Sequence, residues 1–134
     1  MSDPARVVIC DDFVSLRTMV RLVLELDERI DVVGEAGDGL QAVELAESLR
    51  PDIMLLDLSM PRCDGLEALP RIREVSPETR VIVYSGLDKA AMEPRARELG
   101  AAAYVEKGIS ADELVAAVSA LAVEVEAAGR SGAA

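Results

Sequence analysis

The stretch IMLLDLSMP, residues 53–61, is the part of the chain from which the fold is most readily inferred. Its apolar half, Ile53–Leu56, has the length and aliphatic character of a strand that is buried on both faces. Asp57 follows at once, and Pro61 ends the stretch. A carboxylate therefore stands where a buried strand gives way to a loop, which is a position typical of a reactive group.

Four other short aliphatic runs alternate with segments of helical period. This pattern predicts repeated strand–helix units and a parallel sheet covered by helices on both faces. The predicted strands are Arg6–Cys10, Asp31–Ala36, Ile53–Asp57, Val81–Ser85 and Ala103–Glu106. The predicted helices are Val14–Leu26, Gly39–Leu49, Leu66–Val75, Ala90–Leu99 and Ala111–Glu126. The expected fold class is α/β, a single doubly wound (βα)5 domain with a five-stranded parallel sheet.

Local signals refine the helix limits. Ser110 and Glu113 form a capping box at the start of the last helix. Pro70 and Pro94 fall inside the third and fourth predicted helices, where a proline removes a hydrogen bond. We therefore expect the fourth helix to be short or to begin near Pro94.

Length and composition indicate one domain with an aliphatic core. The chain has 134 residues, of which 51% are hydrophobic but only 2% aromatic. We expect the domain to span residues 1–128 and residues 129–134 to form a flexible tail or the start of a linker. No apolar stretch reaches the roughly 20 residues that cross a bilayer, and the N-terminus does not resemble a signal peptide, so we expect a cytoplasmic protein without membrane contact.

Charge and the scarce residue types exclude several function classes. The formal net charge of −11 disfavours direct nucleic-acid binding by this domain. Histidine is absent, which excludes His-ligated zinc and a Ser-His or Cys-His catalytic pair. Cys10 and Cys63 lack metal-ligand spacing. Cys10 is expected to be a small buried hydrophobe, whereas Cys63 could be exposed and oxidisable in its loop.

Charged residues also follow other predicted strands: Asp11 and Asp12 follow the first, and Lys107 follows the fifth. Because ligands of parallel sheets bind beyond the carboxyl ends of the strands, these residues are expected to converge with Asp57. Carboxylates about 4 Å apart repel each other by roughly 4 kcal/mol at an effective dielectric constant near 20. A divalent cation would relieve this repulsion, and oxygen ligands favour Mg²⁺, Mn²⁺ or Ca²⁺ over zinc.

This set of groups permits phosphoryl transfer to a carboxylate. Asp57 is the best candidate for the nucleophile, because a metal and Lys107 would neutralise charge on the transferring oxygens. Ser85 ends the fourth predicted strand and could offer its hydroxyl to a phosphoryl oxygen. Gly86 would leave room for the donor.

Five motifs follow one another along the chain: Asp11-Asp12, Asp57 with Ser59-Met60-Pro61, Asp64-Gly65, Ser85-Gly86 and Tyr104–Lys107. Any one of them is weak, but five in this order are specific together. With them the chain resembles the receiver domain of bacterial two-component response regulators. The resemblance covers residues from about Arg6 to Val125 and is closest to receivers of the LuxR-type class. It implies the flavodoxin-like strand order 2-1-3-4-5.

The resemblance implies that Asp57 is the phosphoacceptor and takes its phosphoryl group from a sensor histidine kinase or a phosphotransfer protein. It implies that Mg²⁺ or Mn²⁺ is ligated by Asp12, Asp57 and the backbone carbonyl of Ser59, while Asp11 acts largely through water. Lys107 would pair with the phosphoryl group.

The resemblance also implies a switch. Ser85 would swing toward the phosphoryl group, and Tyr104 would turn inward. The changed surface would surround the fourth helix, fifth strand and fifth helix and would address a downstream protein or the chain's own effector domain. Val115 and Val123 lie off the core stripe of the last helix. A homodimer formed on phosphorylation is therefore a further hypothesis.

Simpler interpretations exist for each residue taken alone. Asp11 and Asp12 could cap the first helix, and Lys107 could be an ordinary solvated lysine. Ser85 could be a turn residue, and Tyr104 could fill a gap between sheet and helix. Their shared position at strand ends favours the site.

The predicted function is a phosphorylation-dependent switch, not a turnover enzyme, with Mg²⁺-dependent self-phosphorylation and autodephosphorylation. The alternative is a receiver fragment of a DNA-binding transcriptional regulator whose effector domain lies outside this sequence. A phosphatase of the haloacid-dehalogenase kind fits less well, because its second Asp stands two residues after the nucleophile on the first strand, and Asp11 and Asp12 are adjacent. A phosphorylation-independent scaffold would be favoured only by a degraded site. The chain departs from the family pattern at Gly108, where many receivers have proline, at Ser85, where threonine is common, and at Pro94.

Overall fold

The computed structural model describes residues 3–127, in which five strands and five helices alternate. The strands are β1 (Ala5–Cys10), β2 (Ile30–Ala36), β3 (Ile53–Leu56), β4 (Arg80–Ser85) and β5 (Ala103–Glu106). The helices are α1 (Val14–Leu24), α2 (Gly39–Leu49), α3 (Gly65–Val75), α4 (Lys89–Glu98) and α5 (Ala111–Val125). The predicted tail, 129–134, lies outside the described residues.

All strand pairs are parallel, in the order β2-β1-β3-β4-β5. The α/β fold class and the strand order 2-1-3-4-5 are thereby confirmed. From β1 the chain first adds β2 on one side and then adds β3, β4 and β5 on the other side. β1 and β3 are therefore neighbours in the sheet, and the order of strands switches between them. Ligands of open parallel sheets bind at such a switch point, beyond the carboxyl ends of the strands.

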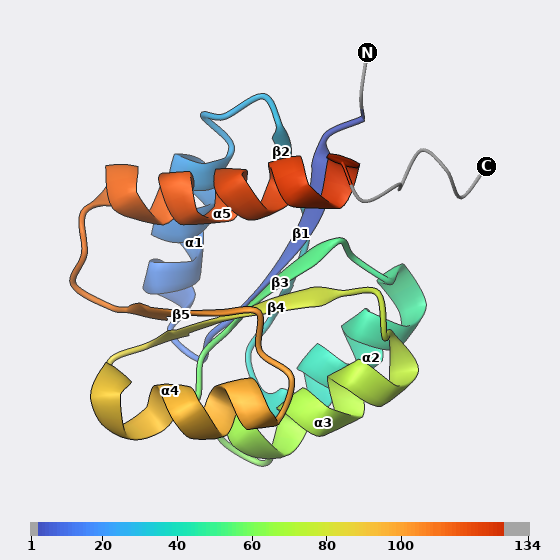
Figure 1. The fold of residues 1–134 in the computed structure, drawn as a ribbon, viewed down its shortest axis with the longest axis vertical. Coiled ribbons are helices and arrows are strands. Elements are labelled where there is room, and N and C mark those ends of the chain that lie inside the picture. The colour runs from blue at the N-terminus through green and yellow to red at the C-terminus, as the bar shows by residue number, and fades with distance from the viewer. Residues whose placement is uncertain (1–2, 128–134) are drawn as a thin grey trace.

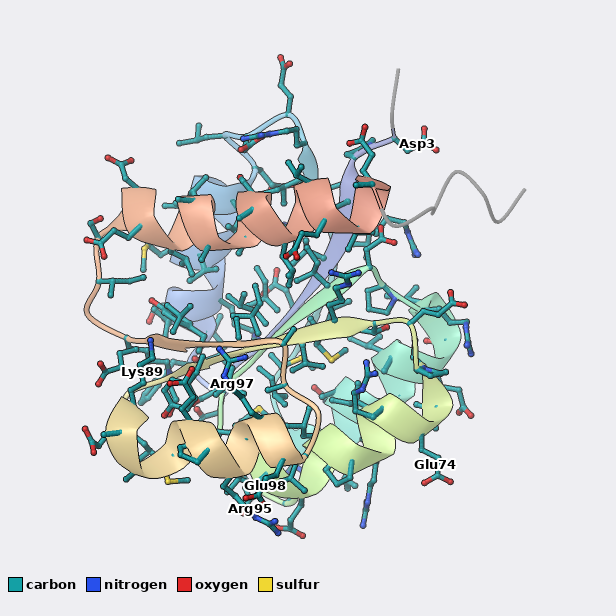
Figure 2. All side chains as sticks on the ribbon, in the orientation of Figure 1. Asp3, Glu74, Lys89, Arg95, Arg97 and Glu98 are labelled. Atoms are coloured by element: carbon teal, nitrogen blue, oxygen red, sulfur yellow. The ribbon has the colours of Figure 1, made fainter. Side chains whose placement is uncertain are left out.

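The sheet lies between two helical layers, with α1 and α5 on one face and α2, α3 and α4 on the other (Figure 1). Successive side chains of a strand point to opposite faces. Val7 and Ile9 accordingly pack in the cluster that contains Leu24 of α1, whereas Val8 packs in the cluster that contains Ile72 of α3. Figure 2 shows side chains filling the space between the layers, while charged groups point outward from the helices. This rigid frame carries the strand ends described below.

Side-chain caps define where most helices begin. Asp38, Asp64, Asp88 and Ser110 each accept a hydrogen bond from a backbone N–H in the first turn of the following helix. Such a cap contributes about 1 kcal/mol. The predicted cap at Ser110 is confirmed. The exception is α1, whose N-cap is Phe13 and has no side-chain cap, so neither Asp11 nor Asp12 caps that helix.

Of the two alternatives for the fourth helix, a short helix or a start near Pro94, the second is wrong, whereas α4 with 10 residues is the shortest of the five helices. The helix begins at Lys89, because Asp88 caps it by accepting from the N–H of Ala91. Pro94 lies within the helix, where it removes the hydrogen bond that its own N–H would have made. Pro70 is accommodated in α3 in the same way, after the cap at Asp64.

Both cysteines are free and buried. Cys10 is a small hydrophobe at the end of β1, as predicted. The expectation that Cys63 is exposed is wrong, because its side chain packs in the core cluster beneath α2 and α3 and only 3% of the residue is exposed. Among residues 3–127, no helix is long and apolar enough to cross a membrane.

Candidate functional site

The site begins with backbone hydrogen bonds that continue the sheet past the ends of its strands. The N–H of Asp57 donates to the carbonyl of Cys10 over 3.0 Å, and the N–H of Lys107 donates to the carbonyl of Ser85 over 2.8 Å. The N–H of Asp11 donates in the same way to Ala36 over 2.9 Å. The side chains at this edge therefore start from a rigid frame.

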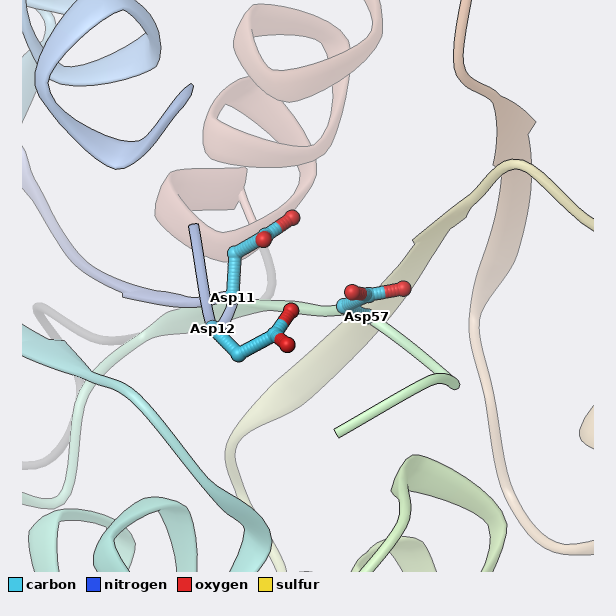
Figure 3. A group of neighbouring side chains, drawn as sticks. All are labelled: Asp11, Asp12 and Asp57. Atoms are coloured by element: carbon cyan, nitrogen blue, oxygen red, sulfur yellow. The ribbon is translucent and has the colours of Figure 1, made fainter. Parts of the chain in front are cut away.

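The three predicted carboxylates lie together at this edge. One carboxylate oxygen from each of Asp11, Asp12 and Asp57 lies within 4.8 Å of the other two. Figure 3 shows the three side chains rising beside one another from the ends of two neighbouring segments. Asp11 and Asp57 are buried, whereas Asp12 is exposed. The arrangement concentrates negative charge beside the buried end of β3.

Lys107 lies against this group. Its Nζ lies 2.7 Å from Oδ2 of Asp11 and 3.3 Å from Oδ2 of Asp57. It also stands 5.8 Å from the centre of the Tyr84 ring, a neighbour that the sequence did not suggest. Burial alone would lower the pKa of Lys107, but the hydrogen bond to Asp11 and the charges of both carboxylates outweigh burial and raise it. Lys107 is therefore a fixed positive charge of the site and not a freely solvated lysine.

Asp57 is held in a less favourable environment. Burial raises the pKa of Asp57 above its ordinary value of 3.8, and the charge of Asp11 adds to the rise. The N–H of Ser59, which donates to Oδ1 over 3.2 Å, and the charge of Lys107 lower the pKa but do not cancel the effect of burial. The ionised form of Asp57 is thus less stable here than in water.

Contacts that the sequence pattern does not indicate position the loop of residues 11–13, which follows β1. Oδ1 of Asp11 accepts a hydrogen bond from the N–H of Phe13 over 2.9 Å. The Arg17 side chain donates to the carbonyl of Asp11 and, through Nε, to Glu35 over 3.1 Å. Nothing in the sequence pattern marks Arg17, since one arginine on a helix has many possible partners.

Gly65 was included in the resemblance, but its physical role emerges only from the packing. A Cβ atom at this position would lie 2.3 Å from the carbonyl oxygen of Asp57. The first residue of α3 can therefore approach the backbone of Asp57 only because it has no side chain.

The donor set fits a hard divalent cation. Three carboxylates share one edge with a single ammonium group that contacts two of them. Oxygen ligands of this kind suit Mg²⁺, Mn²⁺ or Ca²⁺. The charge that remains after pairing with Lys107 is negative, so a cation would lower the repulsion among the carboxylates.

The hydrogen bonds of the Ser85 and Tyr104 side chains go to the loop after β4 and not to the acidic group. Ser85 is fully buried, and its Oγ accepts a hydrogen bond from the N–H of Leu87 over 3.1 Å. The Tyr104 ring is 3% exposed, and its hydroxyl donates to the carbonyl of Leu87 over 3.0 Å. Tyr104 is thus already turned inward. A Cβ atom at Gly86 would have no heavy atom within 4 Å, so the space beside Gly86 is open.

Comparisons with known proteins agree with this geometry. A family model described as the response regulator receiver domain matches residues 7–119. The chain is 40% identical over 116 residues to the nitrate/nitrite response regulator protein NarL of Escherichia coli K12, which covers 87% of this chain and 54% of that protein. It is 36% identical over 113 residues to the chemotaxis protein CheY of Listeria monocytogenes. This alignment covers 84% of this chain and 94% of that protein.

A solved structure shows the same architecture. The signal receiver domain of the putative response regulator NarL from Mycobacterium tuberculosis superposes with a TM-score of 0.85 at 37% identity, covering 90% of this chain and 98% of that one. The chain spans about half the length of several of the relatives that it matches, NarL of E. coli among them.

Proposed function

Because the chain belongs to the response regulator receiver family, we propose that it is a signalling switch that accepts a phosphoryl group on Asp57. The observation that carries this proposal is the pairing of buried Asp57 with Lys107 at 3.3 Å, beside two further carboxylates. A buried carboxylate with a raised pKa and a fixed cation beside it is a candidate reactive group.

The proposed reaction forms one bond and breaks one. A carboxylate oxygen of Asp57 attacks the phosphorus of the donor, and the bond from phosphorus to the donor's nitrogen or oxygen breaks, leaving that electron pair on the donor. Negative charge then lies on the phosphoryl oxygens, where the ammonium of Lys107 stabilises it. The product is an acyl phosphate, so each chain is modified once and no substrate is turned over.

We propose that Asp12, Asp57 and the backbone carbonyl of Ser59 hold Mg²⁺ or Mn²⁺, with Asp11 acting largely through water. When bound, the cation would supply positive charge against the phosphoryl oxygens. Ser59 is exposed, and its N–H donates to Oδ1 of Asp57, which keeps the Ser59 backbone beside the acceptor carboxylate. The chain's own residues orient the acceptor, since Lys107 and the Ser59 N–H fix its two oxygens.

The switch that we propose runs through Ser85 and Tyr104. Phosphorylation adds a charge of about −1.5 to −2, which favours any arrangement that brings a donor to it. The Ser85 hydroxyl can turn from the N–H of Leu87 toward the phosphoryl oxygens. This would release Leu87, whose carbonyl also accepts a hydrogen bond from the Tyr104 hydroxyl. The rearranged surface would include α4, β5 and α5.

The partners proposed are a sensor histidine kinase or phosphotransfer protein as donor, and a downstream protein or an effector domain as recipient. A homodimer formed on phosphorylation, a cytoplasmic location and a domain spanning residues 1–128 remain predictions.

The proposal is tested by incubating the protein with a small phosphodonor, with and without Mg²⁺, and weighing it intact. We expect a gain of one phosphoryl group that requires Mg²⁺ and is lost in Asp57→Asn. The matched control is Asp52→Asn, since Asp52 lies directly before β3. This variant should gain one phosphoryl group like the wild type. Absence of any gain in the wild type would contradict the proposal.

A second candidate is the receiver part of a longer transcriptional regulator. The match of this chain to 54% of NarL favours it, whereas the match to 94% of CheY favours a stand-alone switch. The reading frame beyond codon 134 of the gene distinguishes the two.

A further inference from the structure

We propose that Arg62 and Asp38 form a clamp between α2 and the loop of residues 58–64, and that this clamp positions the Ser59 carbonyl for a divalent cation. This inference rests on the metal site proposed above. Arg62 and Asp38 are positioning residues in this scheme, since neither reaches the acceptor carboxylate.

The clamp is a two-donor ion pair to a buried carboxylate. Oδ2 of Asp38 accepts from Nε of Arg62 over 3.0 Å and also from Nη2. The Asp38 side chain is 3% exposed, whereas that of Arg62 is 64% exposed. Both donors meet the same carboxylate oxygen, and charge-assisted hydrogen bonds of this kind are stronger than neutral ones. The exposed arginine is therefore tied to a carboxylate inside the molecule.

The two oxygens of Asp38 divide their work. Oδ1 accepts from the N–H of Gln41 over 2.9 Å and so caps α2, while Oδ2 holds Arg62. The start of α2 and the loop are thereby joined by one side chain. Charge is not needed for the cap, because asparagine also caps helices.

The backbone of Arg62 points to the same role. Its φ of 64° lies in the left-handed region, which residues other than glycine adopt infrequently. Such a conformation persists where surrounding contacts over-determine it. The ion pair to Asp38 is a contact of that kind, because it directs the side chain back across the loop.

A second contact lies beside the ion pair. Gly39 begins α2, and a Cβ atom there would lie 1.9 Å from the carbonyl oxygen of Cys63. The loop backbone thus rests directly on the helix start. Asp57 anchors the loop at one end through its bond to Cys10, the clamp anchors it at Arg62, and the contact with Gly39 anchors it at Cys63. Ser59 lies between these anchors, so their positions determine where its carbonyl can lie.

The test uses the full chain and MgCl₂ as the only ligand. Arg62→Gly removes the ion pair and places at this position a residue that adopts the left-handed conformation readily. Asp38→Asn removes the charge of the carboxylate and keeps the cap of α2. We expect each variant to bind Mg²⁺ about 10-fold more weakly, as is usual when a residue that orients a ligand is lost. Amide hydrogen exchange of residues 58–64, measured without metal, should be faster, and both variants should melt within about 4 °C of the wild type. Arg62→Lys, which keeps one charge, should recover part of both losses.

The matched control is Arg95→Ala, which removes an arginine of similar exposure on α4. It should leave Mg²⁺ affinity and loop exchange unchanged. The clamp is overturned if Arg62→Gly binds Mg²⁺ with the wild-type affinity and keeps wild-type loop exchange. A lower melting temperature with uniformly faster exchange also overturns it, because that result indicates a structural role alone. If the wild type binds no Mg²⁺, the metal site itself fails and so does the positioning role.

Discussion

The two edges of the parallel sheet treat polar groups in opposite ways. At the carboxyl edge, the oxygens of Asp11, Asp12 and Asp57 lie within 4.8 Å of one another, and Lys107 contacts only two of these residues. At the amino edge, arginines and buried hydroxyls pair with backbone carbonyls. One edge concentrates like charge, whereas the polar side-chain atoms buried at the other are hydrogen-bonded.

The amino edge shows how complete the pairing is. The Thr79 hydroxyl is fully buried, donates to the carbonyl of Pro51 over 2.7 Å and lies 2.6 Å from the Ser76 hydroxyl. Arg6 and Arg50 donate to the carbonyls that end α2 and α3, namely those of Leu49 and Val75. Throughout residues 3–127, no buried side-chain nitrogen or oxygen lacks a hydrogen-bond partner. The difference teaches that the fold can satisfy its polar groups, so repulsion at the carboxyl edge is specific to the site.

The largest effect is expected from Lys107→Met, which breaks the charge balance of the carboxyl edge. The substitution keeps the apolar stem beside Tyr84 but leaves two buried carboxylates without a cation. We expect the free energy of unfolding without metal to fall by about 3 kcal/mol at neutral pH. Denaturant unfolding measures this change. The same substitution at exposed Lys89 is the control, and an equal loss there would show that charge at the site is unimportant.

Thr79→Val breaks the amino edge instead. The shape is retained, but the carbonyl of Pro51 and the hydroxyl of Ser76 lose a buried partner. We expect a loss of about 2 kcal/mol in the free energy of unfolding. The loss should be the same with and without Mg²⁺, and phosphorylation should be unaffected. Thr18→Val, at an exposed hydroxyl on α1, should change stability by less than about 0.5 kcal/mol. A loss at Thr79 that Mg²⁺ restores would link the edges and contradict the comparison.

Asp12→Asn should raise the stability of the metal-free protein, whereas the two preceding substitutions lower it. Asp12 is exposed, and one of its carboxylate oxygens lies within 4.8 Å of an oxygen of each buried neighbour. Its neutralisation should stabilise the metal-free protein by up to about 1 kcal/mol and weaken the stabilisation that Mg²⁺ provides. Asp31→Asn, at an exposed site on β2, controls for the net charge of −11. Equal stabilisation by both variants would assign the effect to overall charge.

The pH dependence of stability differs in sign between the edges. The pKa of Asp57 is raised by burial, so its ionisation destabilises the fold as pH rises above about 4. At the amino edge, hydrogen bonds from Arg29 and then from Ser119 lower the pKa of Asp27, so its contribution is present above about pH 4 and is lost as pH falls further. In unfolding measured from pH 2 to 7 without metal, Asp57→Asn should remove a decline above pH 4. Asp27→Asn should remove a loss below it, and an exchange of the two effects would be inconsistent with the pKa directions.

The groups of the site that follow strands could be predicted from the sequence. Strand ends require only the apolar period, and parallel topology then brings Asp57 and Lys107 to one edge. The start of α4 depends on the cap at Asp88, which the sequence analysis does not include, and a proline inside the helix does not indicate where the helix begins. The family resemblance supplied the strand order, which periodicity alone does not determine.

Other contacts could not be predicted, since they join residues far apart in sequence without a repeating pattern. The Thr79 hydroxyl reaches Pro51, and Arg62 reaches Asp38, through backbone turns whose dihedral angles the sequence does not reveal. No sequence signal separates Arg62 from other loop arginines. Its left-handed backbone and its ion pair to Asp38 distinguish it in the structure.

The central claim is that the carboxyl edge holds charge that a cation relieves, and one measurement tests it directly. The free energy of unfolding is measured at pH 7 for the wild type and Asp57→Asn, each with and without Mg²⁺. Without Mg²⁺, Asp57→Asn should be the more stable protein, because it removes a buried ionised carboxylate. Mg²⁺ should stabilise the wild type more than the variant. A less stable metal-free Asp57→Asn, or equal stabilisation of both proteins by Mg²⁺, would contradict the account.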